Sequence, residues 1–283
     1  HKRLVQSRYW SKPGKASLPC LTIPTLIFLF LKTCMSPQNI SCQDNKFRIY
    51  LGSTAFLLAA TLVTIMIAPL ILVAAVFPFP VRYSCARAWA GTVLKIAELC
   101  CGIRYEVEGL EHLNTGSAAI VLSNHQSAWE TIAFRYLLPP QTSLVKQSLL
   151  WIPFWGWAMA TLKPIAIDRN NKHAALRKLI SHGTEALKQG LWIIVFPEGT
   201  RMPSNQMGEF SAGGAMLAQK SGYPVIPIAH DAGKCWPRYS FLKYPGTIKV
   251  KIGFPIVSKD RKTSDINKDA ESWVMQALRE LTQ

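Results

Sequence analysis

The stretch SNHQSAWE, residues 123–130, places a histidine and a glutamate five positions apart, and such a pair is suited to acid–base chemistry. A carboxylate that holds the ring of His125 fixes its tautomer and raises its basicity, so the ring can accept a proton from an attacking hydroxyl. Ser127 and Glu130 also fit a capping box, in which Glu130 accepts from a free backbone N–H at a helix start. We expect these two uses of Glu130 to compete, because one carboxylate cannot easily serve both groups at full strength.

A second polar cluster, FPEGTR at residues 196–201, contains groups suited to binding a phosphate. Arg201 follows a Gly-Thr turn and offers a planar fork of donors that matches phosphate oxygens. Glu198 could orient a substrate hydroxyl or position the guanidinium of Arg201. The alternative is an ordinary solvated arginine at the end of a strand, and this motif alone does not decide between the two.

Both clusters follow short apolar runs typical of buried strands, and strands alternate with amphipathic helices along the chain. The predicted strands cover residues 118–124, 191–199, 223–230 and 247–255, and the predicted helices cover residues 171–190 and 265–281. This alternation indicates an α/β fold with a mostly parallel central sheet flanked by helices. Reactive residues in such folds gather beyond the carboxyl ends of the strands, so we expect the two clusters to be neighbours.

A long uncharged segment, residues 53–79, predicts an N-terminal membrane helix or helix pair before the α/β region. It contains no Asp, Glu, Lys or Arg and can cross a hydrocarbon core about 30 Å thick. Pro69 lies inside it, so a kinked or re-entrant pair is an alternative to one straight span. A buried core helix is a further alternative, although globular helices rarely stay apolar on every side at this length.

The composition also favours a membrane partner. Hydrophobic residues make up 49% of the 283 residues, and the formal net charge is +16. An anionic lipid surface fits this charge better than nucleic acid, because the sequence has no zinc-finger spacing, RNP-like aromatic signature or long basic run. The seven cysteines form no C-x-x-C pair, which favours free thiols in a reducing compartment.

Several other reaction types lack their usual sequence signatures. There is no G-x-S-x-G nucleophile elbow, no P-loop, and no G-x-G-x-x-G after a strand. The six histidines are dispersed and no H-E-x-x-H occurs, so we expect no metal site.

Several blocks of this sequence resemble, in type and order, the 1-acyl-sn-glycerol-3-phosphate acyltransferases of the wider glycerophospholipid acyltransferase family. These blocks are NHQSAWE (124–130), LLWIPFWGWAMA (149–160), KPIAIDR (163–169), FPEGTR (196–201) and VIPIAHDAGKCWPR (225–238). The resemblance covers roughly residue 56 to the C-terminus. It suggests three parts: an atypical leader over 1–50, a membrane anchor over 51–82 and an acyltransferase domain over 83–283. We expect the leader to be disordered or not native, with the natural start at Met35; a signal-type apolar region or an interfacial segment at residues 20–34 is the alternative.

The resemblance implies transfer of a fatty acyl group from acyl-CoA or acyl-carrier protein to the sn-2 hydroxyl of 1-acyl-sn-glycerol 3-phosphate, which gives phosphatidic acid. It implies that His125 is the general base and that Glu130 orients the ring and raises its basicity. The residues that it assigns to substrate binding are Glu198, Gly199, Thr200, Arg201, Arg169 and Lys146, with Asp168 near the same phosphate. It implies no cofactor, because the acyl donor is itself a substrate.

Two positions depart from the commoner family pattern. Glu130 stands where Asp is more usual, a variant that also occurs in the bacterial branch. The segment EFSAGGA, residues 209–215, lacks the Lys or Arg that relatives often carry there, which weakens any further phosphate contact. Another lysophospholipid or an ornithine-type lysolipid is the alternative acceptor. The resemblance implies a bacterial inner membrane, with the catalytic domain on the cytoplasmic face.

Overall fold

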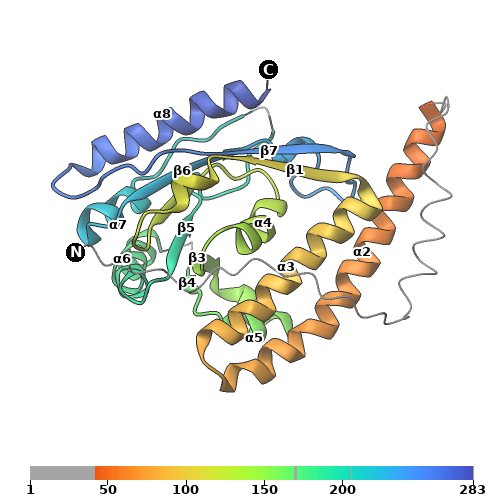
Figure 1. Ribbon diagram of the computed structural model, residues 1–283, viewed down its shortest axis with the longest axis horizontal. Coiled ribbons are helices and arrows are strands. Elements are labelled where there is room, and N and C mark those ends of the chain that lie inside the picture. Colours follow the sequence, from red (N-terminus) through yellow and green to blue (C-terminus); the bar gives the residue numbers. More distant parts are fainter. Residues whose placement is uncertain (1–41, 169–170, 205, 283) are drawn as a thin grey trace, which may run out of the picture. The chain divides into compact units, whose positions relative to one another are not determined.

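The computed structural model describes the whole chain except residues 1–41, 169–170, 205 and 283, so most of the predicted leader lies outside the described residues (Figure 1). The helices are α2 (Cys42–Val73), α3 (Phe79–Cys101), α4 (Trp129–Leu137), α5 (Trp155–Ala160), α6 (Lys172–Lys188), α7 (Gly213–Ser221) and α8 (Thr263–Thr282). The strands are β1 (Ile103–Glu108), β2 (Ile120–Ser123), β3 (Gln141–Lys146), β4 (Ile165–Ile167), β5 (Trp192–Val195), β6 (Val225–His230) and β7 (Gly246–Ile252). Four short 3-10 turns also lie in this part of the chain: η1 (Ala74–Val76), η2 (Leu110–Leu113), η3 (Gln147–Trp151) and η4 (Ala232–Lys234).

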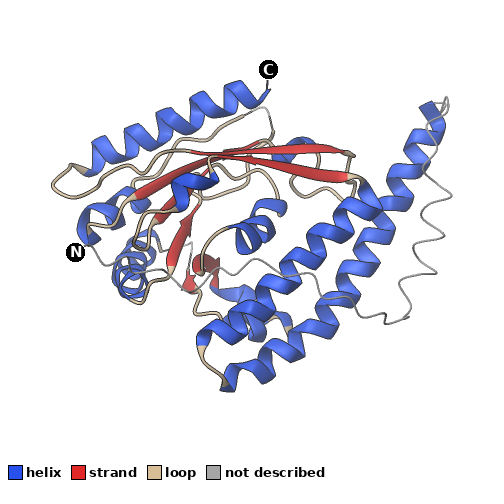
Figure 2. Ribbon diagram, in the orientation of Figure 1, coloured by secondary structure: helices blue, strands red, loops and turns tan. Residues whose placement is uncertain are grey.

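The described strands form one seven-stranded sheet in the order β1-β7-β6-β2-β5-β3-β4 (Figure 2). All neighbours from β6 to β4 run parallel, whereas β7 is antiparallel to β6 and parallel to β1. The prediction of a mostly parallel sheet flanked by helices is therefore confirmed. Because β6, β2, β5, β3 and β4 share one direction, their carboxyl ends meet at the same edge of the sheet.

The central strands are apolar because both faces of the sheet are covered. Every residue of β2, β5 and β6 is buried, as expected for parallel strands between two helical layers. Helices α6, α7 and α8 pack on one another and cover one face, while α3 and α4 cover the other (Figure 1). The polar loops emerge from the ends of these strands, and the enclosed core keeps those strand ends rigid.

The long apolar segment forms most of α2, which packs against α3 as an antiparallel pair. The Trp89 Nε1 donates to Thr64 Oγ1 at 3.0 Å, and the Cys101 Sγ donates to Gly52 O at 3.4 Å near the start of α2. Pro69 lies inside α2 without ending it. Among the described residues, residues 45–76 are the one helical stretch long and apolar enough to cross a membrane. The predicted division at residue 50 falls within α2.

One side of α2 is attached to the sheet domain and the other faces outward. Phe56 is buried, with its ring centroid 4.9 Å from that of Trp236, and Ser53 Oγ accepts from Lys243 N at 2.9 Å. From residue 57 to the end of α2, the large exposed apolar side chains are Leu57, Leu58, Leu62, Ile65, Met66, Leu70 and Val73. Helix α2 thus presents a long apolar face outward, while Ser53 and Phe56 on its other side join the packed core.

Candidate active site

His125 lies in the loop between β2 and α4, and Glu130 lies in the first turn of α4. Glu130 Oε1 accepts from His125 Nδ1 at 2.7 Å, and the same oxygen accepts from Gln126 N at 2.9 Å and from Ser127 N at 2.7 Å. Ser127 Oγ accepts from Trp129 N at 3.1 Å. The expectation that capping and ring binding compete is therefore wrong, because one carboxylate oxygen serves both.

The ionisation of Glu130 determines which nitrogen of His125 can act as a base. Burial of this carboxyl would raise its pKa, but the hydrogen bonds from the His125 ring and from the N–H of Ser127 act in the opposite direction, and the pKa is lowered. An ionised carboxylate can only accept, so Nδ1 of His125 carries the proton and Nε2 presents a lone pair. Glu130 Oε2 is buried and has no hydrogen-bond partner among the described residues.

Aromatic packing holds the ring of His125 in place. The Phe196 ring stacks on it with centroids 4.2 Å apart and an interplanar angle of 16°. Phe134 of α4 in turn stacks on Phe196 at 6.2 Å. Phe196 directly follows β5, so the FPEGTR segment contributes to the orientation of the histidine.

Glu198 joins the ends of β2 and β5 through backbone hydrogen bonds. Its Oε2 accepts from His125 N at 2.9 Å, and its Oε1 accepts from Gly208 N at 3.1 Å. Burial raises the pKa of Glu198 to about 7, although both hydrogen bonds act in the opposite direction. The structure therefore gives Glu198 a role in positioning His125, whereas its predicted substrate contact stays a prediction.

In the rest of the FPEGTR segment, Gly199 and Thr200 are exposed to solvent, and a backbone hydrogen bond just after its end joins it to His125. Gly199 adopts φ 72°, a conformation that favours glycine, and both Gly199 and Thr200 are exposed. Arg201 is half-buried, and the next residue, Met202, donates its N–H to His125 O at 2.7 Å. The two predicted clusters are thus brought together at one edge of the sheet.

Of the remaining predicted binding residues, Lys146 ends β3 at the same edge of the sheet. Lys146 is exposed at the end of β3, beside Ile167 of β4. No ion pair within the described part of the chain includes Lys146. Arg169 lies outside the described residues. The structure therefore places Lys146 on the same edge as His125 without joining it to the histidine, and its substrate contact stays a prediction.

Sequence reasoning missed the partnership of Asn124 with His230. Asn124 Nδ2 donates to His230 O at 2.9 Å, and Asn124 Oδ1 accepts from His230 N at 3.0 Å. The His230 ring contacts Asn124 O through Nε2 at 2.9 Å, while Ala232 N donates to Nδ1 at 3.3 Å. Burial lowers the pKa of His230, consistent with a neutral ring protonated at Nε2. These bonds fix the β2 loop to the end of β6.

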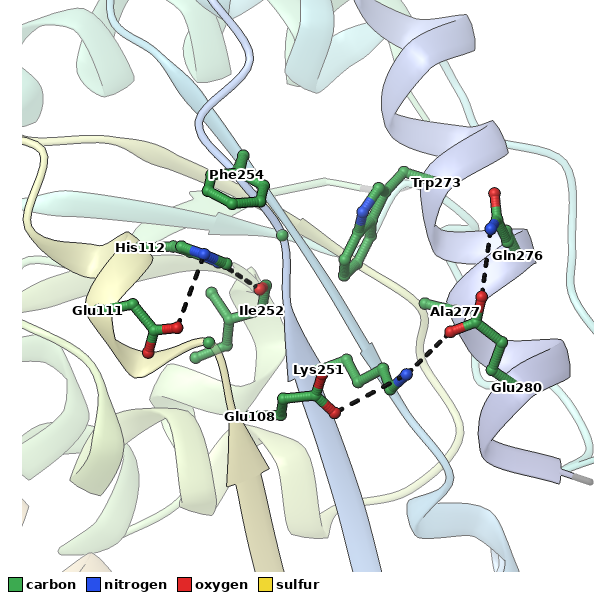
Figure 3. Close-up of a pocket in the computed structure, with 12 residues that line it drawn as sticks. Glu108, Glu111, His112, Lys251, Ile252, Phe254, Trp273, Gln276, Ala277 and Glu280 are labelled. Carbon is green, nitrogen blue, oxygen red and sulfur yellow. Dashed lines mark hydrogen bonds and ion pairs between the residues drawn. The ribbon is translucent and has the colours of Figure 1, made fainter.

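A cavity of about 250 Å³ lies away from these residues, between the ends of β1 and β7 and helix α8 (Figure 3). Lys251 crosses it, with ion pairs to Glu280 at 2.8 Å and Glu108 at 3.7 Å. Because β1 and β7 run against the other strands, their carboxyl ends lie at the opposite edge of the sheet from His125. This cavity is therefore separate from the candidate site.

Comparisons with known proteins identify the family. The sequence model of the family described as Acyltransferase matches residues 104–231. The 1-acyl-sn-glycerol-3-phosphate acyltransferase of Pseudomonas aeruginosa is 44% identical over 214 residues, which cover 74% of this chain and 83% of that protein. The enzyme of the same name from Limnanthes alba is 28% identical over 235 residues, covering 81% of this chain and 83% of the relative.

A solved structure extends the likeness to the fold. The crystal structure of PlsC, the 1-acyl-sn-glycerophosphate (LPA) acyltransferase from Thermotoga maritima, matches with a TM-score of 0.72 and 25% identity. The match covers 84% of this chain and 98% of that one. The chain therefore belongs to the acyltransferase family that contains the 1-acyl-sn-glycerol-3-phosphate acyltransferases, and it is an acyltransferase.

Proposed function

We propose that this enzyme transfers a fatty acyl group from a thioester donor to the sn-2 hydroxyl of 1-acyl-sn-glycerol 3-phosphate, giving phosphatidic acid. The observation that carries this proposal is the base at Nε2 of His125. Its ring is oriented by buried Glu130 and stacked on Phe196, and its carbonyl is hydrogen-bonded to the residue after Arg201. The printed names of the relatives support the choice of acceptor.

In the proposed mechanism, Nε2 of His125 removes the proton of the sn-2 hydroxyl as its oxygen attacks the thioester carbonyl carbon. The buried Glu130 carboxylate stabilises the imidazolium that forms. The C–S bond then breaks, and the imidazolium returns the proton to the departing thiolate, so that free thiol and ester are the products. No acyl-enzyme forms, and no cofactor is needed. The donor is either acyl-CoA or acyl-carrier protein.

The acceptor's phosphate is proposed to bind beside the FPEGTR turn. Arg201 supplies a guanidinium fork, and the exposed Gly199–Thr200 backbone lies next to it. Lys146 and Arg169, after β3 and β4, are proposed to add positive charge further along this edge. Glu198 contributes by holding His125 N.

The outward face of α2 supports a membrane location for this reaction. A 32-residue stretch with seven large exposed apolar side chains between Leu57 and Val73 is costly to leave in water, and a lipid layer would cover it. We propose the bacterial inner membrane, with the catalytic domain on the cytoplasmic face. Both substrates of the proposed reaction carry apolar acyl chains, so this location would bring the site to them.

A thiol-release assay on vesicle-reconstituted enzyme tests the proposal. The panel comprises 1-acyl-sn-glycerol 3-phosphate, other lysophospholipids and an ornithine-type lysolipid, each with acyl-CoA or acyl-carrier protein. We expect the fastest release with 1-acyl-sn-glycerol 3-phosphate, and we expect His125→Ala to lower kcat by at least 10³-fold while the protein still folds. Faster turnover of another acceptor would assign the enzyme to that lipid, and near-normal turnover by His125→Ala would exclude the mechanism.

A further inference from the structure

A second guanidinium lies beside Arg201, on the loop that follows β6. Arg238 Nη1 donates to the backbone oxygen of Arg201 at 2.5 Å. The guanidinium carbons of Arg201 and Arg238 lie 5.9 Å and 6.0 Å from the centroid of the same ring, that of Tyr239. Two arginines from separate loops thus converge on one aromatic side chain.

Neither of these two cations forms an ion pair with a carboxylate in the part of the chain that the structure describes. None of the ion pairs formed by the described residues includes Arg201 or Arg238. The acid nearest to Arg201 in sequence, Glu198, uses both oxygens to accept backbone N–H groups. Two guanidinium groups near one exposed ring concentrate positive charge on these loops, and a phosphate offers several oxygens to such guanidinium forks.

The loop that carries Arg238, residues 237–244, is held in a strained conformation. Tyr239 has φ 55°, in the left-handed region that costs a non-glycine residue about 1–2 kcal/mol, and its side chain is 79% exposed. Lys243 Nζ donates to Ser240 O at 3.0 Å and to Phe241 O at 2.8 Å, which holds the loop closed. Strain that the surroundings maintain in this way is typical of functional sites.

The position of the pair fits the chemistry of the acceptor. Met202 N donates to His125 O, so the backbone of Arg201 is one residue from a direct contact with the proposed base. In 1-acyl-sn-glycerol 3-phosphate, the carbon that bears the phosphate ester is bonded to the carbon that bears the reacting hydroxyl. A hydroxyl at Nε2 of His125 would therefore carry its phosphate close by.

We propose that Arg238 is a second phosphate-binding residue, which binds the phosphate of the acceptor together with Arg201. This inference rests on the acceptor proposed above. Arg238 contributes binding and takes no part in proton transfer. The phosphates of an acyl-CoA donor and the head groups of bulk anionic lipid have related chemistry, so the experiment must separate these sources from the acceptor.

The test measures kcat and both KM values for Arg238→Gln, Arg238→Lys and the charge-matched control Arg104→Gln, an exposed residue on β1. We expect Arg238→Gln to raise the acceptor KM about tenfold or more, from loss of a charge-assisted hydrogen bond, with kcat and donor KM within threefold. Arg238→Lys should recover part of this loss, and Arg104→Gln should match the wild type. Raising the ionic strength should increase the acceptor KM of the wild type more than that of Arg238→Gln.

Three results would overturn the inference: an unchanged acceptor KM, a comparable rise in donor KM, or weaker binding to vesicles of anionic phospholipid that lack the acceptor. The double variant Arg201→Gln/Arg238→Gln separates direct binding from an effect through Arg201. If Arg238→Gln adds nothing in the Arg201→Gln background, Arg238 only supports the Arg201 backbone and the inference fails. Inactivity of the wild type toward this acceptor would instead exclude the proposed function.

Discussion

Replacing Glu130 by glutamine removes the charge next to His125 while keeping an oxygen that can cap α4. The carbonyl oxygen of glutamine can still accept from Gln126 N and Ser127 N, the two backbone donors that Oε1 now holds. It cannot stabilise the imidazolium, and its amide can donate to Nδ1 and so favour the wrong tautomer. Capping should therefore survive better than catalysis.

The size of the effect follows from the geometry of the pair. Nδ1 and Oε1 are 2.7 Å apart, and Glu130 is fully buried. With charge centres about 4 Å apart and an effective dielectric constant of about 20, the attraction is about 4 kcal/mol. If half to all of the imidazolium charge has developed in the transition state, kcat falls between about 30-fold and about 1000-fold.

Thiol release at saturating acceptor and donor measures kcat, and thermal unfolding of the same sample measures stability. The matched control is Ser127→Ala, which removes the oxygen that accepts from Trp129 N but leaves Glu130 in place. We expect both variants to lose about 1–2 kcal/mol of stability, with kcat of the control within threefold of wild type. If Glu130→Gln keeps more than a third of wild-type kcat, Glu130 only caps the helix and the catalytic reasoning is refuted.

Two further predictions concern stability. Because the folded protein holds the proton of Glu198 up to a pKa of about 7, against 4.5 in the unfolded chain, its contribution to stability is greatest below pH 4.5 and falls as pH rises toward 7. Urea unfolding should show that, between pH 5 and pH 8, the free energy of unfolding of the wild type falls by about 1–2 kcal/mol relative to that of Glu198→Gln, after allowance for solvent screening. A difference between the two proteins that does not change with pH would contradict this. In thermal unfolding, Phe56→Ala should lower the free energy of unfolding by about 3–5 kcal/mol, because Phe56 is buried and packs on Trp236. The substitution Leu57→Ala, at its exposed neighbour, should lower it by under about 1 kcal/mol, and equal losses would show that α2 is not part of the core.

The strands with continuous apolar runs could be predicted from the sequence, and the weaker ones could not. β2, β5, β6 and β7 lie within or close to the predicted ranges. The first three are apolar on both faces because they are buried between two helical layers, whereas β7 alternates apolar residues with Lys249 and Lys251. β1, β3 and β4 were not predicted. The first two, IRYEVE and QTSLVK, are largely polar, and the third has three residues, so pairing with neighbouring strands determines them.

In the candidate site, too, only contacts between residues close in sequence could be predicted. The contact of His125 with Glu130 could be anticipated because both lie on one short loop and helix start. The bonds of Glu198 to His125 N and of Asn124 to His230 join residues 73 and 106 positions apart, and in all three bonds the partner of the side chain is a backbone group. A backbone N–H or C=O has no sequence signature, so only the sheet order shows which loops meet.

Glu130 Oε1 accepts three hydrogen bonds, and these bonds couple the start of α4 to the chemistry of His125. Helix ends open locally far more often than whole domains unfold. Each time the first turn of α4 frays, the amides of Gln126 and Ser127 would lose their acceptor and the imidazole would lose its carboxylate together. Exchange of these two amides with solvent deuterium would then report the fraction of enzyme without a working base. On heating, activity would decline before the sheet itself melts.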